Sequence, residues 1–189
     1  MNALRKWDVT LLLDIRSRPR SLRFPHFSQP EFEQSLREAS LAYLFLGEEL
    51  GGRPEDPKAY RPDGVVDYRE RRKSFGFQAG IERVLSELKH QDLALLCAEE
   101  DPLECHRFLM VCPELVTCAV QPQHIRKGGR LERQSEAEDR LLAAHHFGDV
   151  ASDSLFAASA DRAAALEEAY IAQAERCAFR ADPQAVEYW

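Results

Sequence analysis

Residues 92–110 read DLALLCAEEDPLECHRFLM, and this stretch decides how the chain is organised. The apolar run Leu93–Leu96 predicts a short buried strand that ends at Cys97. Asp101 and Pro102 follow as an N-cap and a first helical residue, so a helix is expected to begin there. The stretch therefore predicts a strand, a turn rich in reactive side chains, and a helix whose first turns carry a second thiol, an imidazole and a guanidinium.

Working outward, apolar runs alternate with helical patterns over the first 130 residues. Short runs predict strands at 9–15, 41–46 and 93–96, and a last short strand from 117–120 and 123–125. Helical spacing predicts helices from residue 29 and over 75–89. Pro113 is expected to end the helix that follows the central turn. The alternation predicts an α/β fold, with a mostly parallel sheet of about four to five strands and flanking helices.

The pattern changes at residue 131, where two helical segments follow, at 135–147 and 161–179. Residues 131–189 carry 5 Lys+Arg against 12 Asp+Glu, whereas residues 1–130 carry 20 of each. We therefore expect an α/β domain over 1–130 that carries the site. Residues 131–189 are expected to be a helical extension that packs on the domain or mediates a homodimer.

Composition narrows the class of protein and its location. The 189 residues are 44% hydrophobic and 30% charged, and no apolar run approaches the ~18 residues that a membrane span needs. A membrane partner is therefore not expected. The N-terminal residues do not match a secretory signal pattern. Five cysteines, an odd number, argue against a disulfide framework and favour a reducing cytoplasm.

Polar residues follow the ends of three predicted strands. Asp14 begins an arginine-rich loop (RSRPRSLRFPHF, 16–27), Gly51-Gly52-Arg53 follows the second strand, and Cys97 follows the third. Carboxyl ends of parallel strands share one edge of a sheet, where α/β proteins bind ligands. Arginines at such an edge suit an anion. We predict Glu99, His106 and Cys97 as catalytic residues, and Asp14, Arg16, Arg20, His26, Gly51, Gly52, Arg53, Cys105 and Arg107 as ligand-binding residues.

Metal binding is the first of four interpretations of the central stretch. Cys97, Glu99, Cys105 and His106 all have ligand side chains, but adjacent Cys and His on one helix point about 100° apart. A zinc deaminase would also need a later P-C-x-x-C motif, which the chain lacks. No metal and no other cofactor is therefore predicted, and zinc is kept as an alternative.

Three other interpretations use the same residues differently. Cys97 could be a nucleophile, activated by a helix N-terminus and Arg107, although Glu99 and Glu100 would oppose a thiolate. Glu99, with a carboxylate such as Asp14 or Glu49 opposite, could instead act as acid, base or nucleophile while arginines hold a phosphate. In the fourth interpretation, Cys97 and Cys105 are small buried hydrophobes and the acidic turn merely starts a helix.

Four motifs follow one another in the chain: DIRS at 14–17, PHF at 25–27, LGGR at 50–53, and CAE through CHR at 97–107. Together they resemble the bacterial family catalogued as domain of unknown function 488, and His124-Ile125 with Gly128 is similar to that family's last strand. The resemblance covers roughly residues 8–130. It implies a compact α/β domain in a cytoplasmic bacterial protein and supports one shared site, but it implies no established reaction.

The resulting hypothesis is an enzyme that acts on a phosphate-bearing ligand, either a nucleotide or a nucleic-acid component. Arg16, Arg20, Arg53 and Arg107 would hold the anion, and Glu99 would transfer protons together with His106. The alternative is a non-catalytic module that binds a nucleotide or another anion and oligomerises through its helical tail.

Overall fold

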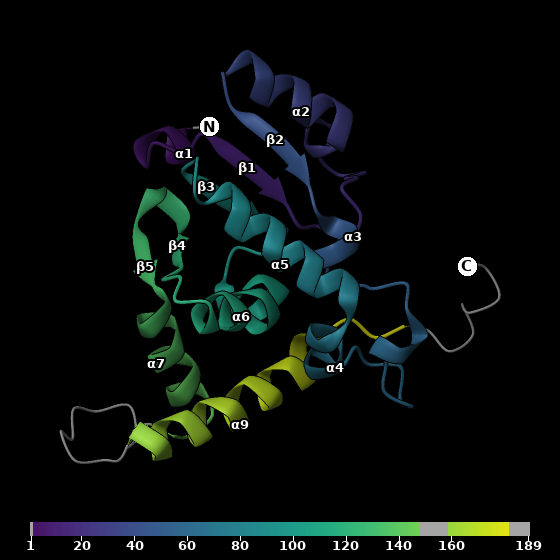
Figure 1. Ribbon diagram of the computed structural model, residues 1–189, viewed down its shortest axis with the longest axis vertical. Helices are drawn as coiled ribbons and strands as arrows, with labels where there is room; N and C mark the ends of the chain where they lie inside the picture. The colour runs from purple at the N-terminus through teal and green to yellow at the C-terminus, as the bar shows by residue number, and fades with distance from the viewer. Residues whose placement is uncertain (1, 148–158, 182–189) are drawn as a thin grey trace. The chain divides into compact units, whose positions relative to one another are not determined.

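The computed structural model describes residues 2–147 and 159–181, which form two compact units. The first unit comprises residues 2–98 and 179–181, and the second comprises the described residues between 99 and 178. Figure 1 labels the helices and strands of both units. The boundary expected at residue 130 falls inside the second unit, because the central turn belongs with the C-terminal helices.

The first unit is built on a parallel sheet of three strands in the order β2-β1-β3. These strands are β1 (Leu11–Asp14), β2 (Ala42–Phe45) and β3 (Leu93–Leu96). Asp14 lies opposite both Phe45 and Leu96, so the three carboxyl ends coincide at one edge. The predicted strands 9–15, 41–46 and 93–96 are confirmed, together with the rim that their ends were expected to share.

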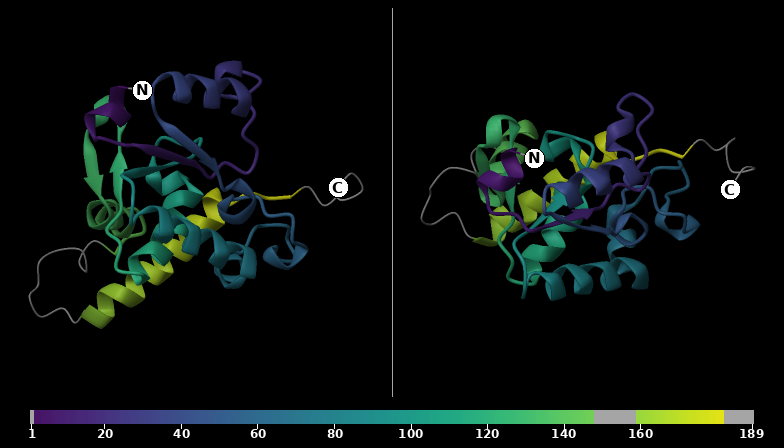
Figure 2. Two further views of the ribbon diagram at one scale, coloured as in Figure 1. Left: turned by 45° about the horizontal axis from the view of Figure 1, so that its top comes forward. Right: turned by 90° about the horizontal axis from the view of Figure 1, so that it is seen from above.

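Helices cover both faces of this sheet. Phe32 and Leu36 of helix α2 pack with Val9, Leu12 and Leu41 in one hydrophobic cluster. Helix α5 belongs to the crossover that runs the other way across the sheet, so a right-handed connection places it on the opposite face (Figure 2). The helical elements of this unit are α1 (Asn2–Lys6), η1 (Pro25–Phe27), α2 (Gln29–Glu38), α3 (Gly47–Leu50), η2 (Pro57–Ala59), α4 (Tyr68–Lys73) and α5 (Phe75–Glu87).

The second unit is mainly helical and contains a separate β-hairpin. Its core is formed by apolar side chains from the segment after the central turn and from both C-terminal helices, including Phe108, Met110, Leu141, Leu142 and Ala169. Its elements are η3 (Pro102–Glu104), η4 (Arg107–Val111), α6 (Cys112–Thr117), β4 (Gln123–Ile125), η5 (Lys127–Gly129), β5 (Leu131–Arg133), α7 (Gln134–Ala144) and α9 (Ser159–Cys177).

The expected sheet of four to five mostly parallel strands is not confirmed. Of the predicted last strand, 123–125 exists as β4, but it pairs antiparallel with β5 in a sheet of its own. The predicted strand residues 117–120 are instead the last residue of α6 and the turn that follows it. The connection between β4 and β5 is short, and Gly128 turns it with a φ of 77°. Such a short connection can join only antiparallel neighbours, because a parallel pair needs a crossover of a dozen residues or more.

The segment after the central turn is also not the single helix that was expected. Cys105 is extended (φ −121°, ψ 132°) between η3 and η4, and η4 is a π-helical turn. Pro113 does not end the helix but lies in the first turn of α6. Because Cys112 donates to the carbonyl of Arg107, five residues back, the widened turn accommodates a proline that lacks an N–H.

Helix α5 approaches α3 closely at Gly80. A Cβ atom at this position would lie 2.7 Å from Cβ of Glu49 and 2.8 Å from Cδ2 of the fully buried Leu50. At Gly76, in the first turn of α5, the nearest atom is Nη1 of Arg71 at 4.0 Å. The two glycines of one helix therefore differ in the space around them.

We predict that Gly80→Ala lowers the free energy of unfolding by about 1–3 kcal/mol, because the added methyl group overpacks the contact between α3 and α5. Gly76→Ala is the matched control and should raise stability by up to about 1 kcal/mol, because alanine favours a helix. Urea titration of both variants measures the difference, and equal effects would contradict the close approach.

Candidate functional site

Strand β1 delivers a fully buried carboxylate, Asp14, to the edge of the sheet. Arg16 donates to it through Nε at 2.9 Å and Nη2 at 2.6 Å, and the hydroxyl of Tyr43 donates at 2.9 Å. Burial raises the pKa of Tyr43 above its usual range, and the neighbouring Asp14 raises it further. The predicted ligand-binding pair Asp14 and Arg16 thus forms an internal ion pair.

The same arginine also fixes the loop that follows β1. Arg16 donates through Nη1 to the backbone carbonyl of Phe27 at 2.9 Å, so it ties the two ends of the loop together. Arg20 and His26, both predicted ligands, are exposed on this loop. Burial lowers the pKa of Arg16, but the hydrogen bond to Asp14 and the charge of that carboxylate raise it above its usual value.

The loop exposes aromatic rings between its basic residues. The ring centres of His26 and Phe27 lie 4.4 Å apart. The ring centre of Phe24 lies 6.1 Å from that of His26 and 6.4 Å from that of Phe27. The guanidinium of Arg23 lies 5.3 Å from the centre of the Phe24 ring. Phe24 is 47% exposed and Phe27 43% exposed, so these rings are available to a partner.

The predicted Gly51-Gly52-Arg53 turn contacts this loop through Ser17. The backbone N–H of Arg53 donates to Oγ of Ser17 at 2.9 Å. A Cβ atom at Gly51 would lie 2.2 Å from the carbonyl oxygen of Gly47 and 2.4 Å from Oγ of Ser17. Glycine is needed here for a close approach of the chain to itself.

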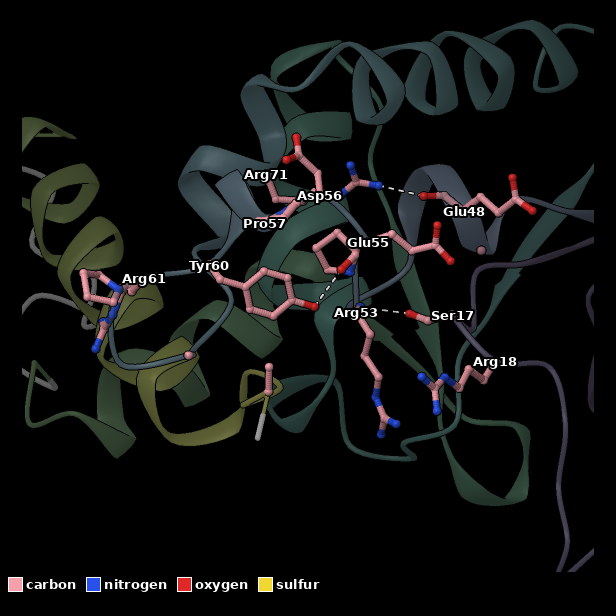
Figure 3. A pocket seen from close by; sticks show the side chains of 15 residues that line it. Ser17, Arg18, Glu48, Arg53, Glu55, Asp56, Pro57, Tyr60, Arg61 and Arg71 are labelled. Carbon is pink, nitrogen blue, oxygen red and sulfur yellow. Dashed lines mark hydrogen bonds between the residues drawn. The ribbon is translucent and has the colours of Figure 1, made fainter. Parts of the chain in front are cut away.

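Beside this turn lies a pocket of about 960 Å³ in the first unit (Figure 3). Four arginines and three carboxylates line it, together with Tyr60 and several small residues and prolines. The lining residues are Ser17, Arg18, Gly47, Glu48, Arg53, Pro54, Glu55, Asp56, Pro57, Tyr60, Arg61, Pro62, Gly64, Arg71 and Ala181.

Arg71 is the buried arginine of this pocket, with 6% of its surface exposed. Its Nη2 donates to the carbonyls of Glu48 at 2.7 Å and Glu49 at 2.6 Å, and its Nη1 donates to Oγ of Ser74 at 3.0 Å. Burial lowers its pKa from the usual value, against the charges of Asp56 and Glu49. Arg71 therefore holds the carbonyl end of α3 in place beside the glycine turn.

Arg18 and Arg53 are the exposed cations of the pocket. Figure 3 shows both side chains extending to the same side, away from the carboxylates of Glu48 and Asp56. The guanidinium of Arg53 lies 4.6 Å from the centre of the Phe179 ring. This arrangement leaves the two guanidiniums on a common side of the cavity.

Tyr60 lines the same pocket as these arginines. Its hydroxyl donates to the carbonyl of Pro54 at 2.6 Å. Burial raises its pKa, while the positive charges of Arg53, Arg71 and Arg18 act in the opposite direction. Three of the four pocket arginines therefore contribute positive potential at one phenol. The fourth, Arg61, forms an ion pair with Asp63 at 2.8 Å.

In the second unit, the central turn gathers Glu99, Cys105 and His106. Their carboxylate, thiol and imidazole atoms lie within 4.8 Å of one another. Cys105 is fully buried, His106 is half-buried and Glu99 is exposed. The cluster offers groups that could transfer a proton or bind a metal ion.

Arg107, a predicted anion ligand, begins η4 directly after this cluster. Its positive charge acts to lower the pKa of Cys112 and the pKa of His124. Burial raises the pKa of the Cys112 thiol to about 12, with Arg107 opposing. Cys112 is therefore a protonated core residue and not a candidate nucleophile.

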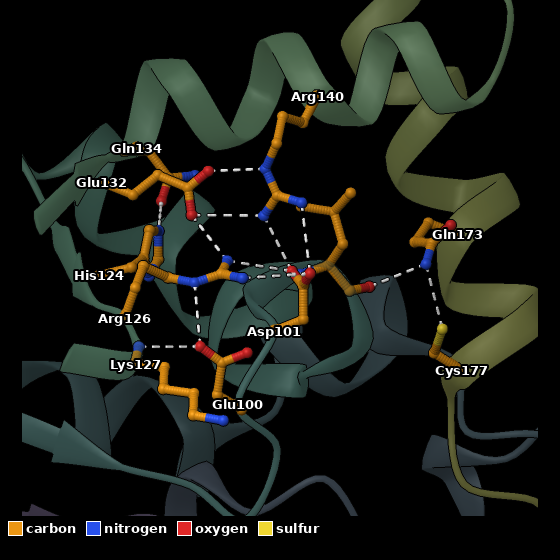
Figure 4. A network of polar contacts seen from close by, with 11 residues as sticks. Glu100, Asp101, His124, Arg126, Lys127, Glu132, Gln134, Arg140, Gln173 and Cys177 are labelled. Carbon is orange, nitrogen blue, oxygen red and sulfur yellow. Dashed lines mark hydrogen bonds and ion pairs between the residues drawn. The ribbon is translucent and has the colours of Figure 1, made fainter. Parts of the chain in front are cut away.

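A network of ion pairs fixes the start of this turn (Figure 4). Asp101 caps η3 by accepting from the N–H of Leu103 at 3.1 Å. Arg140 pairs with Asp101 at 2.9 Å and with the buried Glu132 at 2.6 Å, and Arg126 pairs with the same two carboxylates at 3.2 Å and 2.7 Å. The hydrogen bond from Arg140 is the main reason that the pKa of Asp101 lies well below its usual value.

A second polar chain runs through the core of this unit. Nε2 of His124 lies 3.0 Å from Oε1 of Gln134, whose Nε2 donates to the hydroxyl of Tyr170 at 2.8 Å. Because the Gln134 oxygen can only accept, His124 carries its proton on Nε2. Burial lowers the pKa of His124 to about 4, with the charge of Arg107 acting in the same direction.

The two units divide the predicted site residues between them. The first unit holds Asp14, Arg16, Arg20, His26, Gly51, Gly52, Arg53 and Cys97, and the second holds Glu99, Cys105, His106 and Arg107. Of these, the pocket lining includes Arg53. Sequence reasoning had not selected Arg18, Tyr60, Arg61 or Arg71 as site residues. The basic run 69–73 was the available signal for Arg71, but it does not show which arginine points inward.

The fold and the pocket define an α/β protein with an arginine-lined cavity beside the carboxyl ends of its parallel strands. Residues 1–111 match the model of the family described as Domain of unknown function DUF488, and the chain belongs to that family. This confirms the resemblance that the four motifs carry. No curated protein and no solved structure matches the chain. Within the described residues, every helix is too short or too polar to cross a membrane.

We predict that neutral His124 contributes roughly 3 kcal/mol of stability that acid removes. The unfolded chain binds this proton below pH 6.5, but the folded chain binds it only below about pH 4. The contribution is therefore complete above pH 6.5 and is lost as the pH falls toward 4.

Thermal unfolding between pH 7 and pH 4.5 measures this effect. His124→Gln should start less stable but lose less stability on acidification than the wild type. The exposed His146→Gln is the control and should follow the wild-type profile. Parallel profiles for the wild type and His124→Gln would show that His124 is not the titrating group.

Proposed function

We propose that this protein binds a phosphate-bearing ligand, either a nucleotide or a nucleic-acid component, in its arginine-lined pocket. The observation that carries the proposal is the pair of exposed guanidiniums, Arg18 and Arg53, which extend to one side of a cavity of about 960 Å³. Arginine forms bidentate hydrogen bonds with phosphate, and the cavity volume is at the upper end of the usual range for small-molecule sites.

The carboxylates of the pocket favour a nucleotide over a simple polyphosphate. Glu48, Glu55 and Asp56 are exposed and line the same cavity as the arginines. A carboxylate accepts hydrogen bonds from sugar hydroxyls and amino groups but repels phosphate. A ligand with phosphate at one end and hydroxyl or amino groups at the other matches this division of charge.

The neighbouring loop supports the same ligand class. Ser17 and Arg18 belong both to the pocket and to the loop that exposes Phe24, His26 and Phe27. Exposed rings between basic side chains provide surfaces on which bases stack while the phosphates are neutralised. This feature favours a short single-stranded nucleic acid as one member of the class.

Turnover of the bound ligand is the catalytic extension of this proposal. Glu99 and His106 would carry proton transfer, and Cys97 would line the site. The mutual proximity of the Glu99 and His106 donor atoms in the second unit is the observation that favours it. The proposal includes a cytoplasmic bacterial location, based on the thiol content and the family resemblance. It also includes a homodimer, based on the two C-terminal helices.

We predict that Arg53→Ala weakens the binding of nucleoside monophosphates and of short single-stranded oligonucleotides by about 10- to 100-fold. The reason is the loss of a charged hydrogen-bond donor, which typically contributes about 1.5–3 kcal/mol. Calorimetric titration at a fixed salt concentration measures the affinity. The wild type should also bind less tightly as salt increases.

Arg37→Ala is the matched control, because Arg37 is 77% exposed on α2 and pairs with Glu33 outside the pocket. It should bind like the wild type. If Arg53→Ala and Arg37→Ala bind equally well, or if the wild type binds no member of the panel, the pocket does not hold a phosphate-bearing ligand.

For the catalytic extension, we predict that Glu99→Gln keeps the wild-type ligand affinity but loses turnover, because the amide cannot transfer a proton. Product analysis after incubation with the ligands that bind is the measurement. Glu104→Gln, an exposed carboxylate on the same segment, is the control. Binding without turnover across the panel would favour the non-catalytic module.

A further inference from the structure

We infer that Glu99, Cys105 and His106 form a binding site for a divalent metal ion of the zinc class. Their donor atoms lie within 4.8 Å of one another, although Glu99 precedes the other two by six and seven residues. Ligands of tetrahedral zinc, at about 2.0–2.3 Å from the ion, lie roughly 3.3–3.8 Å apart. A contraction of about 1 Å would therefore complete the ligand set.

The backbone at Cys105 removes the objection that the sequence raises. Adjacent Cys and His side chains diverge by about 100° on a continuous helix. Here Cys105 is extended, with φ −121° and ψ 132°, and the helical segment resumes only after His106. The break between η3 and η4 brings the thiol and the imidazole to the same carboxylate.

The position of Cys105 is fixed from both sides. Its N–H donates to the carbonyl of Pro102 at 3.0 Å, and its own carbonyl accepts from Phe108 and Leu109, each at 3.0 Å. The carbonyl of Leu103 accepts from Nε2 of the buried Gln173 at 2.9 Å. A metal site needs ligands that are held in place before the ion arrives, and this hydrogen bonding supplies that support.

The cap of η3 adds a further constraint. Asp101 fixes the first turn of the segment and is itself held by Arg126 and Arg140. The turn that presents the three ligands is therefore anchored to the hairpin and to α7 of the same unit. Its geometry does not depend on the ion to form.

The donor set selects the class of metal. A thiolate and an imidazole favour zinc and similar transition metals, whereas Mg²⁺ and Ca²⁺ prefer oxygen ligands. Thiolate, imidazole and carboxylate are all ligands of zinc sites, and the exposure of Glu99 gives an ion access to the cluster from solvent. With a metal bound, Glu99 and His106 are ligands, which replaces the proton-transfer role proposed for them above.

Titration of the chelator-treated full-length chain with Zn²⁺ and with Co²⁺ tests the inference. We expect one ion per chain and, with Co²⁺, the near-ultraviolet absorption of a thiolate–cobalt bond. Cys105→Ser should abolish that absorption. His106→Gln and Glu99→Gln should each weaken binding by more than about 10-fold, since loss of an outer partner of a ligand already costs 10- to 100-fold.

Matched controls come from the same chain. The exposed Cys118→Ser and His146→Gln should bind metal like the wild type, and circular dichroism of each variant confirms that it folds. If Cys105→Ser does not fold, the half-buried His106→Gln decides. The inference is overturned if the wild type binds less than one ion per chain, or if His106→Gln and Glu99→Gln bind the metal as tightly as the wild type.

The test is independent of the phosphate ligand. Arg53→Ala, which removes a pocket cation from the first unit, should bind Zn²⁺ like the wild type. A chain that binds metal but no nucleotide would retain this inference and lose the proposed function. A chain that binds nucleotide but no metal would do the reverse.

Discussion

The first unit depends on the ion pair between Asp14 and Arg16 at the end of its central strand. The carboxylate is fully buried, so its desolvation must be offset by good geometry. It receives Nε and Nη2 of Arg16, the Arg16 backbone N–H at 3.1 Å and the Tyr43 hydroxyl. These bonds set the direction in which the chain leaves the sheet, and therefore the position of Ser17 and Arg18 at the pocket.

Much of the first unit could be predicted because its signals are local. Each strand is a short apolar run, and helix α5 repeats apolar residues at helical spacing. The antiparallel pairing of β4 could not be predicted in the same way, because its partner β5 reads LER and shows no apolar run. At Pro113, the π-helical turn that accommodates the proline depends on the preceding residues and not on the proline itself.

The candidate site was likewise predictable only in part. The chain order indicated correctly that the carboxyl ends of three parallel strands share one edge. The glycine turn follows its strand only after the intervening helix α3. The chain order did not indicate that Arg16 would be engaged by a buried carboxylate, nor that Arg71 would turn inward to the carbonyls of α3. Arg16 is only two residues from Asp14, but the burial of that carboxylate depends on packing of distant segments, as does the contact of Arg71 with α3. A single sequence does not display such packing.

Asp101 contacts three segments of the second unit with one short side chain. It caps η3, and its two oxygens receive guanidiniums from the hairpin and from α7. A glutamate would preserve the charge, but its extra methylene group would move the oxygens away from the Leu103 N–H. Aspartate and glutamate are therefore not equivalent at position 101, although they carry the same charge. The length of the side chain, more than its charge, limits which residues can replace Asp101.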